Sequence, residues 1–351
     1  MRKSLKLIMI SFIVIFMLLI VSNPEPCKRG VVNGLLLCGR VIIPSLFPFT
    51  VCVLFLVKNN FLSYLKPLSK VTSYLFNLNS EQFSLVLLSF IGGYPIGAKL
   101  LNEAVTFKKI SPEKASVMLN FCINAGPAFI ITAVGNSVFN MRKIGILLYI
   151  SHLSASFIIC LLSREKLKDK NETKISKNPN SNIADDFVIS VSNASSAMIN
   201  ICCFVILFSC INAFILPLCK GSEVLTFLCG MLETTNALTL TKNIYLISFF
   251  LGFSGICVWL QVLSLCKNIK IKIIPFILCR ILHGALSFIF TYILLKIFKI
   301  TLPTLSNHQF FSTQLLYSTP ALAVSMVITG IVFVVTLTTR KYNCKILEDI
   351  V

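Results

Sequence analysis

Two apolar stretches, one in each half of the chain, are interrupted by small and polar residues that a simple membrane anchor does not contain. They are residues 120–129 and 252–261. Backbone N–H and C=O groups cannot stay unpaired in hydrocarbon, so a break at membrane depth must face protein or a water-filled cavity. Matched breaks in two halves are typical of secondary transporters, whose discontinuous helices point half-helix ends at a solute. The alternative is that Gly and Ala simply ease helix packing.

The composition points to a membrane protein. The 351 residues are 56% hydrophobic and 13% charged, and the mean hydropathy is +0.86, which excludes a soluble globular domain. Apolar runs of roughly 20 residues, long enough to cross a bilayer as helices, begin near Leu5, Val31, Phe83, Ala115, Ile144, Phe187, Val224, Ile244, Ile273 and Ala321. The sequence therefore predicts an all-α, polytopic helical membrane protein whose main surroundings are the lipid bilayer.

The basic surplus is explained by membrane topology and not by a nucleic-acid partner. Lys and Arg number 32 against 13 Asp and Glu, a net charge of +19. They gather near the N-terminus, in residues 164–177 and after residue 339, as the positive-inside bias expects of cytoplasmic segments. Both termini and the central linker are predicted to face the cytoplasm. The surplus also suits anionic lipid or an anionic solute.

The chain is predicted to divide into two membrane halves around a polar segment. Residues 1–22 are expected to form a retained N-terminal membrane helix, because residues 21–26 lack an Ala-x-Ala-like cleavage site. Residues 164–186 are polar and aperiodic, which predicts a cytoplasmic linker. The halves, 31–163 and 187–298, each have a long helix, a Gly-bearing segment, a broken segment and a closing helix, which suggests two repeats. Residues 299–351 add a C-terminal membrane helix and a basic tail.

Some segments are not expected to cross the membrane. Residues 61–78 alternate Lys and Pro with apolar side chains, which predicts an interfacial amphipathic helix. If all five apolar segments of each half crossed, the basic segments would lie on opposite sides of the bilayer. One Gly/Pro-broken segment in each half is therefore expected to be re-entrant.

The sequence lacks the motifs of common enzymes and metal sites. It contains no His-Glu-x-x-His, Gly-x-Ser-x-Gly or P-loop pattern. His152, His283 and His308 are isolated, and each is expected to be structural. The fourteen cysteines lie mostly in apolar segments without a Cys-x-x-Cys pair, so they are predicted to act as small apolar side chains. We expect no catalytic residue, metal or cofactor, and no enzymatic activity.

Ionisable groups inside apolar segments are costly and commonly functional. Glu233, with Thr235 and Asn236 after it, is a candidate for binding a solute or for coupling to a proton or cation; otherwise it is an interfacial residue at a helix end. Arg280 lies deep in its apolar run, where its guanidinium can bind a carboxylate through two parallel hydrogen bonds. Lys99 is a weaker candidate for an anion, because its side chain can also reach the headgroups.

Neutral polar residues at the two breaks complete the candidate site. A break at a Gly-Pro pair creates a half-helix N-terminus, whose positive dipole end suits an anion. In the first half the candidates are Asn120, Asn124, Gly126 and Pro127, and in the second they are Ser254, Gly255 and Gln261.

The ordered series of these motifs resembles the YlbJ-type sporulation integral membrane proteins, which carry the nucleoside-recognition or Gate domain. The resemblance covers residues 31–298 and departs from the family pattern at Asn236-Ala237, where Asn-Gly is expected. It rests on Ile43-Pro-Ser-Leu-Phe-Pro-Phe49, Gly92-Gly-Tyr-Pro-Ile-Gly-Ala-Lys99, Asn120-Phe-Cys-Ile-Asn-Ala-Gly-Pro-Ala-Phe129, Gly230-Met-Leu-Glu-Thr-Thr-Asn236 and residues 250–261.

The resemblance implies two Gate-type repeats, an endospore-forming bacterium and a role in late sporulation. It further implies movement of dipicolinate across the outer forespore membrane, which derives from the mother cell, toward the spore. The sequence prediction is therefore a transporter of a small anionic or ring-shaped solute, acting alone or as a homo-oligomer. The alternatives are a non-transporting membrane scaffold for spore assembly, or a carrier of nucleosides or another small solute.

Overall fold

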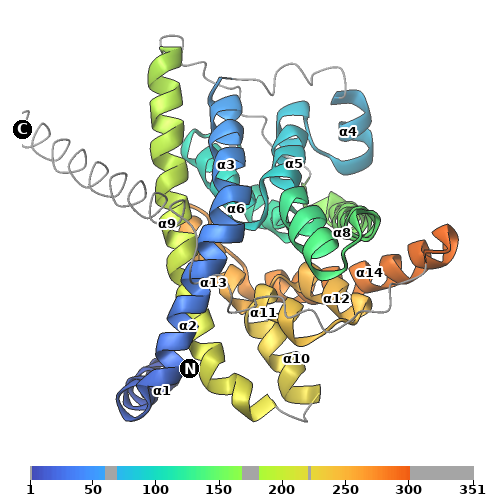
Figure 1. The fold of residues 1–351 in the computed structure, drawn as a ribbon. Helices are drawn as coiled ribbons and strands as arrows, with labels where there is room; N and C mark the ends of the chain where they lie inside the picture. Colours follow the sequence, from blue (N-terminus) through green and yellow to red (C-terminus); the bar gives the residue numbers. More distant parts are fainter. Residues whose placement is uncertain (1, 60–68, 168–181, 220–222, 301–351) are drawn as a thin grey trace, which may run out of the picture.

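The computed structural model describes residues 2–59, 69–167, 182–219 and 223–300, and every regular element in these ranges is helical (Figure 1). Four helical stretches of the described residues are long and apolar enough to cross a membrane: Arg142–Leu162, Ile183–Ile215, Ile273–Phe298, and Ile244–Leu265, which is interrupted at Ser254. A fifth candidate is the pair Ile10–Ser22 and Pro24–Ile42, which is bent by 103°. The predicted all-α, polytopic class is confirmed. The predicted C-terminal membrane helix and basic tail lie outside the described residues.

The long helix of the first half, α2, begins earlier than the predicted start at Val31. Helix α1 (Arg2–Ser22) is followed by α2 (Pro24–Leu37), a π-helical turn η1 (Cys38–Ile42) and α3 (Ile43–Lys58). The predicted start at Val31 was wrong, because Pro24 occupies the first turn of α2, where its missing N–H is not needed. Pro44 likewise lies in the first turn of α3, directly after the π-turn.

The second half opens with helix α9 (Ile183–Ile215), which lies against α2 and α3 along most of its length (Figure 1). Gly30 and Gly34 of α2 make this approach possible. A Cβ atom on Gly30 would lie 2.5 Å from the Cα of Cys210, and one on Gly34 would lie 2.8 Å from the Cα of Ile206. Small residues four apart on one helix face are a common means of close helix packing in membranes.

Residues 164–186, predicted to be a solvated linker, are helical at both ends. Arg164–Leu167 form a short 3-10 turn, η4, and α9 begins at Ile183. Asn182 caps α9 by accepting a hydrogen bond from the Ala184 N–H at 3.3 Å. Asp186 in the first turn is buried and pairs with Lys58 at the end of α3, N to O 2.9 Å. The prediction of solvated linker up to residue 186 was therefore wrong at this end.

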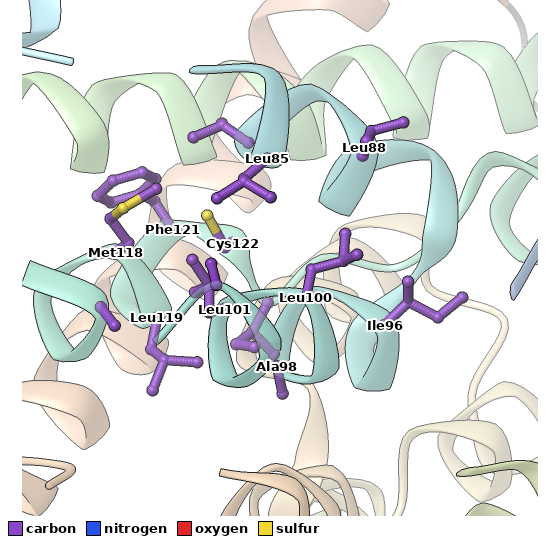
Figure 2. Close-up of a cluster of buried hydrophobic side chains, with 14 of the residues drawn as sticks. Leu85, Leu88, Ile96, Ala98, Leu100, Leu101, Met118, Leu119, Phe121 and Cys122 are labelled. Atoms are coloured by element: carbon purple, nitrogen blue, oxygen red, sulfur yellow. The ribbon is translucent and has the colours of Figure 1, made fainter. Parts of the chain in front are cut away.

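The rest of the first half consists of shorter helices around an apolar core. They are α4 (Ser69–Phe76), α5 (Ser80–Gly92), α6 (Tyr94–Thr106), α7 (Pro112–Cys122), the π-helix η3 (Ala128–Val138) and α8 (Arg142–Leu162). Figure 2 shows part of this core, in which apolar side chains of three helices gather: Leu85 and Leu88 of α5, Ile96, Ala98, Leu100 and Leu101 of α6, and Met118, Leu119, Phe121 and Cys122 of α7. Of the predicted interfacial helix, the structure describes residues 69–78, in which Tyr74 is 76% exposed while Leu78 is fully buried.

The second half repeats the order of elements. After α9 come the 3-10 turn η5 (Leu216–Cys219), α10 (Glu223–Leu232), α11 (Thr234–Leu240), α12 (Ile244–Phe253), α13 (Gly255–Leu265) and α14 (Ile273–Phe298). The closing helices α8 and α14 pack against one another, α8 also against η3 and α14 against α12. The short half-helices of both halves are thereby enclosed by longer ones.

Candidate functional site

The first break separates α7 from η3, and its freed backbone groups are bonded from within the protein. Arg280 of α14 donates from Nη1 to the carbonyl oxygen of Ile123 at 2.5 Å and from Nη2 to that of Asn120. The carbonyl oxygen of Phe121 accepts from the side chains of Asn124 and Ser156, each at 2.6 Å. The requirement that broken helices face protein at membrane depth is met here by side chains from α8 and α14.

One backbone N–H of this break is bonded to a histidine. The N–H of Ala125 donates to Nε2 of His152 in α8 at 3.0 Å. The His152 ring stacks on His283 of α14, with ring centroids 4.5 Å apart. His283 Nε2 in turn lies 3.0 Å from the carbonyl oxygen of His152. The two histidines are therefore not isolated in the structure. Through a hydrogen bond and a ring contact, they connect the first break to α8 and α14.

The second break separates α12 from α13 at Ser254 and Gly255, whose φ angles are +72° and +76°. The carbonyl oxygen of Phe253 accepts from the indole Nε1–H of Trp259 at 3.0 Å. That of Leu251 accepts from the hydroxyl of Tyr94 at 2.5 Å. Tyr94 belongs to the first half, so each half supplies a side chain that bonds the broken helix of the other.

A second discontinuity lies against each break. In the first half, α5 and α6 meet at Gly93, with φ +91°, and a Cβ there would lie 3.4 Å from the N atom of Gly126. In the second half, α10 and α11 meet at Glu233, and a Cβ on Gly255 would lie 3.0 Å from Oγ1 of Thr234. Glycine is favoured at both positions by the positive φ angle, and at Gly255 by the close approach to Thr234 as well.

Segments from all these discontinuities line a common pocket of about 520 Å³, part of which is open to solvent. It contains four of the predicted site residues: Gly126, Glu233, Thr235 and Gln261. Its other lining residues are mostly apolar or lie in first turns of helices: Ile42, Leu46, Gly93, Tyr94, Pro95, Ala125, Phe129, Ile201, Val205, Thr234 and Val258. Among the lining residues, Glu233 is the one with a charged side chain.

Glu233 is 3% exposed and is oriented by the helix that follows it. Its Oε1 accepts from the backbone N–H of Thr235 at 3.0 Å, and its Oε2 from the Thr235 hydroxyl. A carboxylate at the start of a helix is stabilised by these N–H donors and by the positive end of the helix dipole. The side chain therefore caps α11 and faces the pocket as well.

The remaining predicted site residues lie outside this lining. Arg280, Asn120, Asn124 and Ser254 are buried, and the guanidinium of Arg280 is used on backbone carbonyl groups. Lys99 pairs with Glu103 one turn along its own helix, N to O 3.5 Å. Pro127 directly follows the lining residue Gly126, and Gly255 lies beside Thr234. The side chain of Asn236 lies outside what the structure describes.

Sequence reasoning did not connect Tyr94, His152 and His283 with the two breaks. Tyr94 follows Gly92-Gly93 and precedes Pro95, a pattern that marks a helix start and singles it out. The two histidines are 131 residues apart, and no spacing rule connects them. Within the described ranges, no three His, Cys, Asp or Glu side chains gather as metal ligands.

The comparison with known proteins agrees with the membrane architecture. The chain is 23% identical over 344 residues to the sporulation integral membrane protein YlbJ of Bacillus subtilis (strain 168), and the match covers 83% of each chain. No family model matches the chain, and no solved structure does. The chain is thus similar to a YlbJ-type sporulation integral membrane protein along most of its length.

Proposed function

We propose that this protein transports a small anionic solute, namely dipicolinate, across the outer forespore membrane toward the spore. The pocket between the two halves would hold the solute, and alternating exposure of this pocket would move it. The substrate class comes from the family resemblance, and the helix N-termini around the pocket support it.

The observation that carries the proposal is the convergence of half-helix N-termini on one pocket. Tyr94 and Pro95 in the first turn of α6 line it, as do Gly126, just before η3, and Phe129 in the first turn of η3. Helix α13 begins at Gly255, beside the lining residue Thr234. The first-turn N–H groups of a helix lack intrahelical partners and carry partial positive charge, so several such ends around one pocket favour an anion.

The walls of the pocket suit a flat ring. Tyr94 and Phe129 contribute aromatic side chains, and Ile42 and Leu46 contribute apolar ones. An aromatic dicarboxylate would place its ring against these walls and its carboxylates toward the helix ends. Arg280 supports this site indirectly in the proposal, by bonding the carbonyl groups of the first break.

Glu233 is assigned the role of coupling residue. A carboxylate in an anion pocket repels the solute unless it is protonated or paired with a cation. Binding of a proton or cation at Glu233 would therefore accompany binding of the anion. Glu233→Gln removes the titratable charge while keeping shape and one acceptor for Thr235, so we expect transport that no longer depends on a pH or cation gradient.

The test is uptake of labelled dipicolinate by vesicles containing the purified protein, with empty vesicles and Glu233→Gln vesicles as controls. Saturable uptake, and dipicolinate-poor spores in a deletion strain that the wild-type gene restores, would support the proposal. If vesicles containing folded protein move no solute, the protein is a scaffold for spore assembly. Normal spore dipicolinate in the deletion strain, with no redundant carrier present, would contradict the substrate.

A second candidate solute is a nucleoside. It is favoured by the hydrogen-bonding side chains of Glu233, Thr235 and Gln261 in a pocket without a lining Lys or Arg, since these groups recognise sugar hydroxyl and base groups without needing a negative charge. Competition distinguishes the two: excess nucleoside should leave dipicolinate uptake unchanged if the anion is the substrate.

A further inference from the structure

The close approach of α2 and α9 brings two cysteines of opposite halves together. Gly30 leaves room for the backbone of α9 at Cys210. One turn earlier on α2, the sulfur of Cys27 lies 3.1 Å from the sulfur of Cys210. The two residues are 183 positions apart in the sequence. Both thiols are in the reduced form in this structure and are already in contact.

The position of the pair along α9 indicates the compartment that it faces. Cys210 lies 27 residues after Ile183, which is roughly 40 Å of helix at 1.5 Å per residue, more than the ~30 Å thickness of the hydrocarbon core. The polar segment before α9 carries six Lys and Arg between residues 164 and 177, against Lys28 and Arg29 beside Cys27. The positive-inside bias therefore places the start of α9 in the cytoplasm and the cysteine pair on the opposite side.

We propose that Cys27 and Cys210 form a disulfide in the mature protein. Extracytoplasmic compartments sustain disulfides, whereas the cytoplasm keeps thiols reduced. In the proposed step, one thiolate attacks the disulfide of an extracytoplasmic thiol–disulfide oxidoreductase and forms a mixed disulfide. The thiolate of the other cysteine then attacks this mixed disulfide and displaces the oxidoreductase. The Cys27–Cys210 bond forms as the disulfide of the oxidoreductase is broken, and two electrons and two protons pass to the oxidoreductase, which becomes a dithiol.

The bond would join α2 of the first half covalently to α9 of the second half, near the C-terminal end of α9. At the other end of α9, Asp186 already forms an ion pair with Lys58 of α3. With both ends fixed, α2, α3 and α9 form a frame that keeps its shape, and conformational change is confined to the half-helices and the closing helices. This inference goes beyond the proposed function and does not depend on it.

The test uses the full chain in sporulating Bacillus subtilis in place of its own YlbJ, with a protease recognition sequence inserted between Glu172 and Thr173. Cells are quenched with a thiol-alkylating reagent at harvest, and the membranes are cut and run on a gel without reductant. We expect the cut wild type to migrate as one species at 39.0 kDa and to separate into two fragments on reduction. Cys27→Ser and Cys210→Ser should each separate without reductant.

Cys38→Ser is the matched control. Cys38 lies in the same interface, but its sulfur faces the carbonyl oxygen of Cys202 at 3.8 Å, so the cut variant should stay joined. Separation of the cut wild-type halves without reductant would overturn the proposal, whether or not an added oxidant joins them later. Joining that persists in both Cys27→Ser and Cys210→Ser would overturn the assignment of the pair.

Discussion

Arg280 gives the most discriminating prediction, because sequence and geometry suggest different roles for it. The sequence predicts a clamp for an anionic solute, whereas the structure uses Nη1 and Nη2 on the carbonyl oxygens of Ile123 and Asn120. If the guanidinium holds the end of α7, Arg280→Ala should lower stability before it affects any solute. If it binds the solute, the same change should remove transport and leave stability intact.

The magnitude follows from the two bonds that are lost. A hydrogen bond that involves a charged group contributes about 1.5–3 kcal/mol, so removal of both should cost roughly 3–6 kcal/mol. Domains of roughly 150–250 residues lose about 2–4 °C in melting temperature per kcal/mol. Even the lower figure corresponds to a decrease of about 6–12 °C. Arg280→Lys should fall between wild type and Arg280→Ala, because one ammonium group cannot reproduce the planar pair of donors.

Thermal unfolding of the purified protein in detergent measures this effect. Trp259 is the single tryptophan of the chain, and its ring centroid lies 6.1 Å from that of Phe276, one turn before Arg280, so its fluorescence reports on α13 and α14. Lys99→Ala is the control, since the partly exposed Lys99–Glu103 pair should contribute less than about 0.5 kcal/mol. An Arg280→Ala protein that unfolds at the wild-type temperature but transports nothing would refute the capping role.

Three further changes test the packing around the site. Gly97→Ala should abolish folded protein in membranes, because the new Cβ would lie 2.0 Å from a backbone oxygen of α7, whereas Gly39→Ala, with no atom within 4 Å, should express normally. Lys58→Met should lower the free energy of unfolding by roughly 3–5 kcal/mol, because the buried Asp186 carboxylate loses its ammonium partner. Adding Asp186→Asn should recover part of this loss, and equal melting temperatures of wild type and Lys58→Met would contradict the reasoning. Trp259→Phe should lower the free energy of unfolding by about 1–3 kcal/mol, because the carbonyl oxygen of Phe253 in α12 loses its indole donor. Differential scanning calorimetry measures this, and an unchanged unfolding temperature would show that water replaces the indole.

Features with a local sequence cause could be predicted. The breaks at residues 123–126 and at 254–255 follow from Gly, Pro and Ser inside apolar runs, and hydrophobic length gives the helical class. Glu233 and Gln261 stood out as polar residues next to such breaks, and the structure places both on the pocket. These inferences need only neighbouring residues and the cost of unpaired polar groups in lipid.

Features that depend on distant partners could not be predicted. Arg280 looks free in its own helix, and only the folded chain brings it within reach of carbonyl groups about 160 residues away. Asp186 looks like the end of a solvated linker, because its partner Lys58 belongs to the other half. A charged side chain has the same appearance in a sequence whether it faces water, a solute or a buried counter-ion. Packing across the two halves decides between them.

The exchange of capping side chains between the halves has a consequence for biosynthesis. The carbonyl oxygen of Asn120 in α7 lacks its donor until the ribosome has added Arg280, more than 150 residues later. The hydroxyl of Tyr94 in α6 likewise lacks its acceptor until Leu251 of α12 has been added. Neither half can complete its own broken helix, and Arg280 alone is costly to insert into lipid. Insertion of the first half must therefore leave its break in contact with water or with the insertion machinery until α14 arrives. A gene divided within residues 168–181 should yield stable protein only when both pieces are made in the same cell.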